Sequence, residues 1–415
     1  MPLLSRFYYG WVILLVAGLC YGFGMSPVYY GWGIFAPRLT SELAIDRGDI
    51  GGVFGLFNTL YQCVGLFVGL AIARFGLRCV MAVGFCVTAV GLLTLARAET
   101  ILGCYLGFSL LGGIGIGFST VVPAQTLGQN WFLRRRALVI GAIFAFGGIV
   151  ARLVAPAGAW VLEHYDWRMG WLAIAVLSLV LALLAGIAVR ETPETLGLCL
   201  DGERPSPSAR TPSSEDRSAV NSWTAAQAVY TTQFALMLVC GVAYAMPWNT
   251  AVAHLTLHLI DLGYDEVVAI GVIGTMALIS IAGRLLGAVG DWVAPQWVLA
   301  VALALEGLGT AGLLLADDLG LAMLAVTSIG LGFGLAFVSI PVVFSHFFGR
   351  KAFSVTSGIR MTITGLFGGV GPWLAGVAFD STGSYTIPFL GLMCVGITGA
   401  AAAAFMRHPG APPVV

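Results

Sequence analysis

The sequence predicts an all-α membrane protein, with twelve transmembrane helices in two pseudo-symmetric six-helix bundles. Three observations predict this fold class: an apolar composition, twelve long hydrophobic runs, and a weak repeat of the first half of the chain in the second. Of the 415 residues, 59% are hydrophobic and a further 56 are Gly, whereas only 10% are charged. Soluble domains carry about 25% charged residues. Water-soluble enzymes and nucleic-acid-binding proteins are therefore excluded.

The hydrophobic runs follow one another with short polar breaks between them. Each run approaches or exceeds the roughly 20 residues that a helix needs to cross a bilayer. Continuous apolar runs also favour helices over the alternating pattern of a membrane β-barrel. In order, the predicted spans are residues 11–36, 49–72, 79–97, 101–128, 137–162, 169–189, 228–257, 265–289, 297–316, 319–345, 354–379 and 385–406.

The basic residues set the predicted orientation, because the formal net charge is zero and carries no signal. With the amino terminus inside, thirteen Lys and Arg residues fall on the cytoplasmic side, and only Arg38, Arg47, Arg97 and Arg168 fall outside. This bias satisfies the positive-inside rule. We expect both termini in the cytoplasm. One Lys against nineteen Arg is typical of GC-rich bacterial genes, so the expected location is the inner membrane of a bacterium.

The longest polar stretch divides the spans six and six. Residues 190–227 are rich in Pro and Ser and predict a flexible cytoplasmic linker. It separates an amino-terminal bundle (1–189) from a carboxyl-terminal bundle (228–415). The halves also repeat each other, since Pro123 and Pro341 are 218 residues apart, as are Gly69 and Gly287. Repeated bundles are typical of transporters whose substrate site lies between the repeats at mid-membrane.

The loop between the second and third spans carries a recognisable motif. The stretch GLAIARFGLR, from Gly69 to Arg78, resembles the G-x-x-x-D-R-x-G-x-R loop of the major facilitator superfamily. The positions that match are Gly69, Arg74, Gly76 and Arg78. The acidic position is Ala73 here, while its counterpart after the eighth span is Asp291. The resemblance implies a gating loop that latches the two bundles, and the loss of the acid weakens that latch in the first half.

Further motifs resemble the monocarboxylate transporter and oxalate:formate antiporter branch of this superfamily, and together they cover nearly the whole chain. The branch implies a transporter of small carboxylates that rocks its two bundles around a central site, with no cofactor. The motifs are Tyr8-Tyr9-Gly10-Trp11, Asn130-Trp131-Phe132, Asp166-Trp167-Arg168, Gly283-Arg284, Gly371-Pro372 and Asp380-Ser381-Thr382-Gly383-Ser384-Tyr385.

Three arginines lie inside predicted spans, namely Arg152, Arg284 and Arg360, against one clearly intramembrane acid, Glu306. Arginine stays protonated in proteins, and placing it at mid-helix costs about 2.5 to 3.5 kcal/mol on the gentlest insertion scale. The surplus of positive charge needs an anion from outside the chain, such as a substrate carboxylate held by a guanidinium. The sequence therefore predicts an anion site.

Arg284 is the first candidate for that site. Counted from Gly271, it lies about 20 Å along its helix, and Gly283 and Gly287 form a small-residue face for close helix packing. The resemblance implies that this arginine pairs with substrate carboxylate. The alternative is a structural pairing with Glu306 or with backbone carbonyl groups.

Arg360 and Arg152 each leave two interpretations open. Either could contact the anion, or could extend its side chain towards the headgroups. Counted back from Gly371-Pro372, the position of the antiporters' lysine is Thr364 here, one turn after Arg360. Losing that lysine favours a monocarboxylate over a dicarboxylate.

Two titratable residues are candidates for proton coupling. His254 lies near the outer end of the seventh span, where this branch often has a histidine, and it titrates in the physiological range. Glu306 is the second candidate, because burial favours the protonated form of a carboxyl group. Glu306 lies in the ninth span, however, and in this superfamily spans 3, 6, 9 and 12 are usually scaffold helices away from the cavity. The acids that monocarboxylate transporters carry near the arginine are also absent here. Both symport with protons and exchange of anions therefore stay open.

Neutral polar side chains inside the spans complete the expected cavity, with packing or interhelical hydrogen bonding as the alternative for each. Prolines in spans 1, 4, 7 and 10 predict kinks that fit alternating access. The polar candidates for substrate binding, beside His254, are Tyr29, Tyr30, Asn58, Ser119, Gln125 and Asn249.

These observations predict a secondary active transporter of a small organic monocarboxylate, similar to lactate or pyruvate, coupled to protons. The alternatives are a carboxylate exchanger of the oxalate:formate type and a receptor or scaffold that binds without flux. An enzyme is not expected, since no span carries a catalytic or metal-ligand cluster. The expected partners are a small carboxylate, protons and lipid, with no cofactor, metal or nucleic acid, and a monomeric chain.

Overall fold

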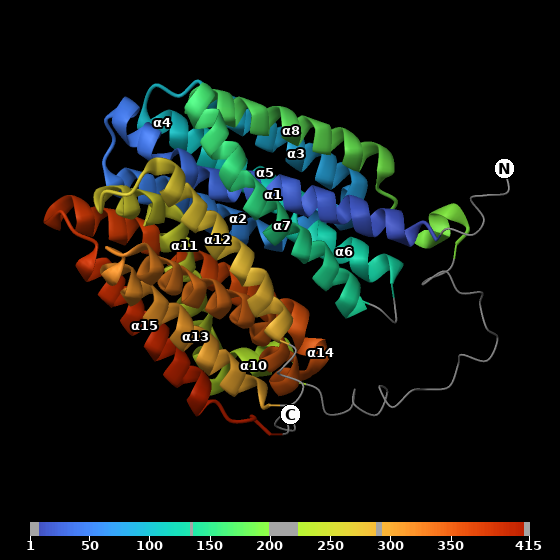
Figure 1. Ribbon diagram of the computed structural model, residues 1–415. Coiled ribbons are helices and arrows are strands. Elements are labelled where there is room, and N and C mark those ends of the chain that lie inside the picture. Colours follow the sequence, from blue (N-terminus) through green and yellow to red (C-terminus); the bar gives the residue numbers. More distant parts are fainter. Residues whose placement is uncertain (1–7, 133–135, 199–222, 288–292, 411–415) are drawn as a thin grey trace. The chain divides into compact units, whose positions relative to one another are not determined.

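The structure is a computed structural model that describes residues 8–132, 136–198, 223–287 and 293–410. Within those ranges every regular element is a helix and no strand occurs (Figure 1). Eleven helices are long and apolar enough to cross a membrane, and α2, which is sharply bent between Gly65 and Phe67, brings the number to twelve. The predicted all-helical, twelve-span fold class is confirmed.

The spans run in the predicted order. Short helices α10 (Ala225–Val229), η3 (Pro193–Leu196) and η7 (Leu313–Leu315) lie between them. The long elements are α1 (Gly10–Leu43), α2 (Arg47–Phe75), α3 (Leu77–Ala96), α4 (Ile101–Cys104) with η2 (Tyr105–Gly112), α5 (Gly113–Ser119) and α6 (Val121–Trp131), α7 (Arg136–His164), α8 (Trp167–Ala188), α11 (Thr232–Asp261), α12 (Glu266–Leu286), α13 (Pro295–Gly312), α14 (Leu319–Thr382) and α15 (Thr386–Phe405).

The helices form two compact units. One comprises residues 1–35 and 63–210, and the other comprises residues 36–62 and 211–415. The end of α1 and the first half of α2 thus group with the carboxyl-terminal helices. The predicted bundles 1–189 and 228–415 and the linker 190–227 stay a prediction about which parts move together, and most of that linker lies outside the described residues.

In the first unit the fourth span is broken where the sequence contains proline. Its helix stops at Ser119, Thr120 leaves helical geometry at φ −113° and ψ −93°, and α6 begins at Val121. The ring of Pro123 clashes with the carbonyl group four residues earlier and has no N–H to donate. These two constraints favour a break at this point, although α7, α11 and α14 contain interior prolines without one. The break at Thr120 confirms the kink predicted for this span.

In the second unit α14 contains two spans and reverses direction between them. The ring of Phe333 stacks on Trp248 of α11 at 3.7 Å between centroids, while Asn249 donates to the Gly368 carbonyl at 3.2 Å. A straight helix from Phe333 to Gly368 would cover about 50 Å, yet both ends contact neighbouring residues of α11. Both halves of this helical hairpin therefore pack against the same helix.

Glycine allows unusually close backbone approaches in this unit. A Cβ atom at Gly283 of α12 would lie 2.5 Å from the Leu331 carbonyl oxygen, and one at Gly334 of α14 would overlap the Ser280 carbonyl oxygen. Residues of α2 approach α14 in the same way, since a Cβ atom at Gly51 would overlap the carbonyl group of Pro372. The small-residue face predicted around Gly283 is confirmed.

Substitution of Gly334 should lower the stability of the folded protein. We expect Gly334→Ala to destabilise the protein by about 1 to 3 kcal/mol, because the added methyl group forces α12 and α14 apart. Gly271→Ala is the matched control on α12, since nothing lies within 4 Å of its added Cβ atom. Thermal unfolding of the detergent-solubilised variants measures the difference. Equal midpoints for the two variants would contradict the proposed close packing.

Candidate functional site

Arg284 lies in the last turn of α12, later in the helix than the count from Gly271 implied. The carboxylate of Asp265 accepts from the Val267 N–H at 2.9 Å and caps the helix, which therefore begins at Glu266. A helical side chain points back towards the amino terminus of its helix. The half-buried guanidinium accordingly lies 4.5 Å from the ring centroid of Phe337 and 6.0 Å from that of Phe333. Phe333 is near the midpoint of its own span, so the charge reaches mid-span depth.

An aromatic cluster continues from Arg284 into α11. Phe333 stacks on Trp248 at 3.7 Å and on Tyr244 at 4.8 Å between ring centroids, with interplanar angles of 13° and 11°. Trp248 is 2% exposed and therefore fixed in place. Ring faces attract a cation through their quadrupole without neutralising it. The cluster thereby positions the guanidinium.

Arg360 approaches the same cluster through Tyr244. This half-buried residue of α14 interacts electrostatically with Tyr244, whose ring stacks on Phe333. Thr364, one turn later, is 1% exposed, and a Cβ atom at Gly241 of α11 would overlap its hydroxyl group. Thr364 therefore packs closely against α11 at Gly241. The structure thus brings both carboxyl-terminal arginines to one aromatic cluster.

Glu306 is buried apart from this charge. Its side chain is 0% exposed on α13, and neither carboxylate oxygen makes a hydrogen bond to a described residue. The polar group that acts on this carboxyl group is the backbone of Trp248. Among the described residues, Glu306 therefore does not form the hydrogen-bonded pair with Arg284 that the sequence left open as an alternative.

His254 and Asn249 both bond to the carbonyl groups of α14 around Gly371-Pro372. His254 Nε2 lies 2.8 Å from the Pro372 carbonyl oxygen, and Asn249 donates to the Gly368 oxygen at 3.2 Å. Both side chains are buried. Asn58 of α2, in the same unit, is also buried and donates to the Phe54 carbonyl oxygen of its own helix at 3.4 Å.

The other polar candidates belong to the first unit. Tyr29 and Tyr30 of α1 meet edge to face with centroids 5.3 Å apart, and the Ser119 hydroxyl donates to the Gly115 carbonyl oxygen at 2.8 Å. Gln125 of α6 is half-buried, whereas Arg152 of α7 is exposed. Within this unit these residues stay predictions as substrate contacts.

The predicted gating loop has a well-defined turn in the first unit. Gly76 adopts φ +77°, which favours glycine, and a Cβ atom there would overlap the Glu191 carboxylate. That carboxylate accepts from the Leu77 N–H at 2.9 Å and caps α3. Glu191 thus stabilises the loop that lacks an acid at position 73. Gly69, Arg74 and Arg78 are exposed, and Asp291 lies outside the described residues.

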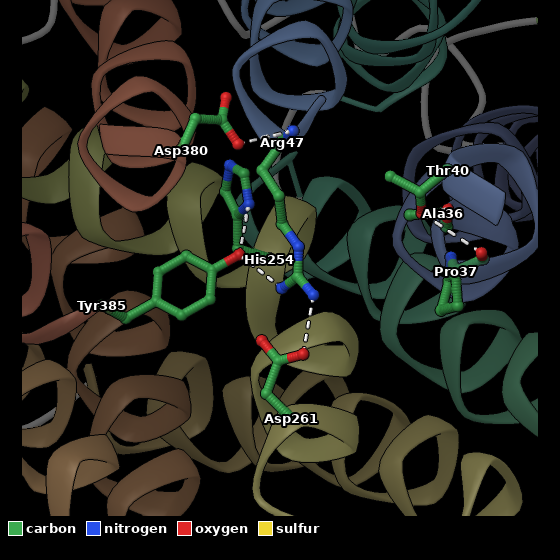
Figure 2. A network of polar contacts seen from close by, with 8 residues as sticks. All are labelled: Ala36, Pro37, Thr40, Arg47, His254, Asp261, Asp380 and Tyr385. Carbon is green, nitrogen blue, oxygen red and sulfur yellow. Dashed lines mark hydrogen bonds and ion pairs between the residues drawn. The ribbon is translucent and has the colours of Figure 1, made fainter. Parts of the chain in front are cut away.

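A second polar network joins residues 36–62 to the carboxyl-terminal helices within the second unit (Figure 2). Arg47 of α2 donates to the Asp261 carboxylate at 2.7 Å and to the Tyr385 hydroxyl at 2.9 Å. The Asp380 carboxylate accepts from the backbone N–H groups of Arg47 and Gly48 at 3.0 and 2.6 Å. It thereby caps the amino terminus of α2 from another helix.

The same network reaches the buried histidine. The Tyr385 hydroxyl lies 3.1 Å from His254 Nδ1 (Figure 2). The Arg47 guanidinium also lies 4.4 Å from the centroid of the Phe379 ring. Burial and the negative charges of Asp261 and Asp380 raise the pKa of the Tyr385 phenol above its ordinary value, so this group keeps its proton. The hydroxyl can therefore both accept and donate.

Sequence reasoning missed this network and the aromatic cluster. Arg47 stood among the outside loop residues, and Asp380 and Tyr385 stood within a family motif without a role. Polar residues at span ends are usually solvated, so a pattern alone gives no partner for them. Phe333 and Phe337 have the 3.6-residue periodicity of ordinary packing residues, which also carries no functional signal.

Comparison with known proteins is consistent with this fold and these positions. The family model described as Major Facilitator Superfamily matches residues 14–372. Monocarboxylate transporter 13 of Bos taurus is 26% identical over 396 residues, covering 92% of this chain and 85% of the relative. Monocarboxylate transporter 11 of Homo sapiens is 30% identical over 403 residues, covering 92% and 79%.

A solved structure shows the same fold. It is a bacterial homologue of the human lysosomal transporter Spinster, with a TM-score of 0.70 at 15% identity, covering 96% of this chain and 94% of that one. Together with the helical spans, these matches show that the chain is a multi-pass membrane transporter and not an enzyme. It belongs to the Major Facilitator Superfamily, in the branch of the monocarboxylate transporters.

Proposed function

We propose that this transporter carries a small organic monocarboxylate together with a proton, by alternating access. The observation that carries the proposal is the guanidinium of Arg284, held at mid-span depth against the ring faces of Phe337 and Phe333. A carboxylate is the group that a guanidinium binds in bidentate geometry. The names of the related monocarboxylate transporters support the same substrate class.

The size of the substrate follows from the packing around Arg284. The rings of Phe337 and Phe333 lie against the guanidinium, Phe333 in turn stacks on Trp248 and Tyr244, and Thr364 replaces a second central cation. One strong cation with an aromatic wall suits an anion with a single carboxylate and a short carbon chain. Arg360, which interacts with Tyr244, is the second anion contact along the path.

The proposal has four further parts. Transport is coupled to protons, the protein lies in the inner membrane of a bacterium, both termini are cytoplasmic, and the chain is monomeric. The basic residues of the cytoplasmic segments support the orientation. Coupling is supported by the need to balance charge, since a monocarboxylate carried with one proton moves as a neutral pair. The two groups available for the proton are His254 and Glu306.

Replacement of Arg284 tests the substrate site. We expect Arg284→Lys and Arg284→Ala to lower the uptake of L-lactate into proteoliposomes by about 10- to 100-fold, because a charge-assisted hydrogen-bonded pair is lost. Arg97→Lys, at an exposed position after α3, is the control for a general loss of arginine. Unchanged uptake by a folded Arg284→Ala variant would refute the role of this residue.

Proton coupling is tested against exchange in the same vesicles. An inward proton gradient should drive L-lactate above its external concentration, and a protonophore should abolish the accumulation. Uptake that is independent of the proton gradient but requires carboxylate inside the vesicle would instead identify an anion exchanger. The two mechanisms therefore give opposite results in one preparation.

A further inference from the structure

The hydrogen bonds around His254 define its protonation state. The Pro372 carbonyl oxygen can only accept, so His254 Nε2, at 2.8 Å, carries a proton and donates to it. In the neutral ring Nδ1 is then an acceptor, and the Tyr385 hydroxyl donates to it at 3.1 Å. Tyr385 in turn accepts from Arg47 at 2.9 Å. Every partner in this relay is satisfied only while His254 is neutral.

A proton on His254 Nδ1 would disrupt the relay. Two donors, the imidazolium N–H and the Arg47 guanidinium, would then point at the Tyr385 oxygen, and the phenol proton would lose its acceptor. A second positive charge would also lie close to Arg47. His254 is 0% exposed, so water cannot relieve either effect.

The two carboxylates of this network are already engaged. The Asp261 carboxylate is already bonded to the Arg47 side chain, and that of Asp380 to the first N–H groups of α2. His258, one turn along α11, is bonded to the Leu313 carbonyl oxygen at 2.9 Å. The titratable and charged groups that surround His254 are Arg47 and Asp49 from α2, His258 and Asp261 from α11, Asp317 before α14, Asp380 from the end of α14, and Tyr385 before α15.

Residues 36–62 are attached to the carboxyl-terminal helices by the ion pairs Arg38–Glu266 and Arg47–Asp261, by the relay at Tyr385 and His254, and by glycine contacts. Residues 36–62 precede the predicted linker by more than a hundred positions, yet they pack in the unit of the carboxyl-terminal helices. Their closest contacts are backbone approaches at Gly51 and Gly55, and the Thr59 hydroxyl donates to the Gly365 carbonyl oxygen at 3.3 Å. Such contacts carry no net charge, so the polar relay is the component that a proton can alter.

We propose that the relay of Arg47, Tyr385 and His254 is an acid-opened latch, which holds residues 36–62 against the carboxyl-terminal helices only while His254 is neutral. The proposal rests on the proposed proton-coupled transport and assigns it a coupling residue. Because the positive-inside pattern places Arg47 outside, acidification of the outer solution protonates His254 and releases α2. The outer side then opens to the carboxylate when protons are abundant there.

His254→Gln is the decisive variant, because the glutamine amide can donate to Pro372 and accept from Tyr385 but cannot bind a proton. L-Lactate uptake by the unmodified protein should rise at least about threefold when the external pH falls from about 7.5 to about 4.5, an acid range that is needed because burial and the nearby Arg47 disfavour the imidazolium. In His254→Gln that dependence should disappear. His258→Gln, four residues along α11, is the matched control and should keep the normal pH profile. A normal profile in His254→Gln overturns the proposal.

A second readout does not depend on the substrate. Thr59→Cys, on the α14-facing side of α2, is labelled with an impermeant maleimide outside intact cells, and its rate is divided by that of Arg97→Cys, an exposed reference thiol, at the same pH, because every thiol reacts more slowly in acid. This normalised rate should be about threefold higher at pH about 4.5 than at about 7.5. Peptide mapping separates this thiol from the native cysteines. Adding His254→Gln should make the labelling slow at both values, and adding Arg47→Gln should make it fast at both.

The two readouts separate the proposals. If labelling follows these expectations but lactate is not carried, the latch stands and the substrate assignment fails. If lactate is carried with protons while labelling is independent of pH or unaffected by His254→Gln, the latch is refuted and the transport proposal stands. Arg47→Gln keeps the test valid should the His254 variant fail to fold.

Discussion

A guanidinium that cannot lose its proton, placed inside an apolar helix bundle, is the constraint on which the rest of the structure depends. Arg284 is held by ring faces, which position a cation without cancelling its charge. The buried carboxyl of Glu306, one helix away, forms no hydrogen bond to any described residue and so does not compensate it. The proposed carboxylate site is built on this guanidinium and on the rings that position it.

The surrounding helices can hold that charge because glycine brings them close together. Gly283 and Gly334 allow α12 and α14 to touch through their backbones, which sets the Arg284 side chain against Phe337. Gly51 and Gly371 do the same for α2, α14 and α11 around His254. The proposed anion site and the proposed latch thus share one feature. In each, a close helix contact at glycine determines where a charged or titratable side chain lies.

Much of this architecture could be predicted from the sequence. Hydropathy gave the twelve spans because each must be long and apolar to cross a bilayer, and Pro123 marked the broken fourth span. The depth of Arg284 was misjudged, because the count ignored the cap at Asp265 and the backward direction of a helical side chain. The partners of Arg47 could not be predicted, since Asp261 and Tyr385 are more than two hundred positions away and only the folded chain brings them together.

The central claim is that Arg284 recognises a carboxylate charge, and calorimetric titration of the purified protein tests it most directly. L-Lactate should bind, lactamide, which has the same shape but no charge, should not, and Arg284→Gln should bind neither. Binding of lactamide as tightly as lactate, or undiminished binding of lactate by Arg284→Gln, would contradict the account.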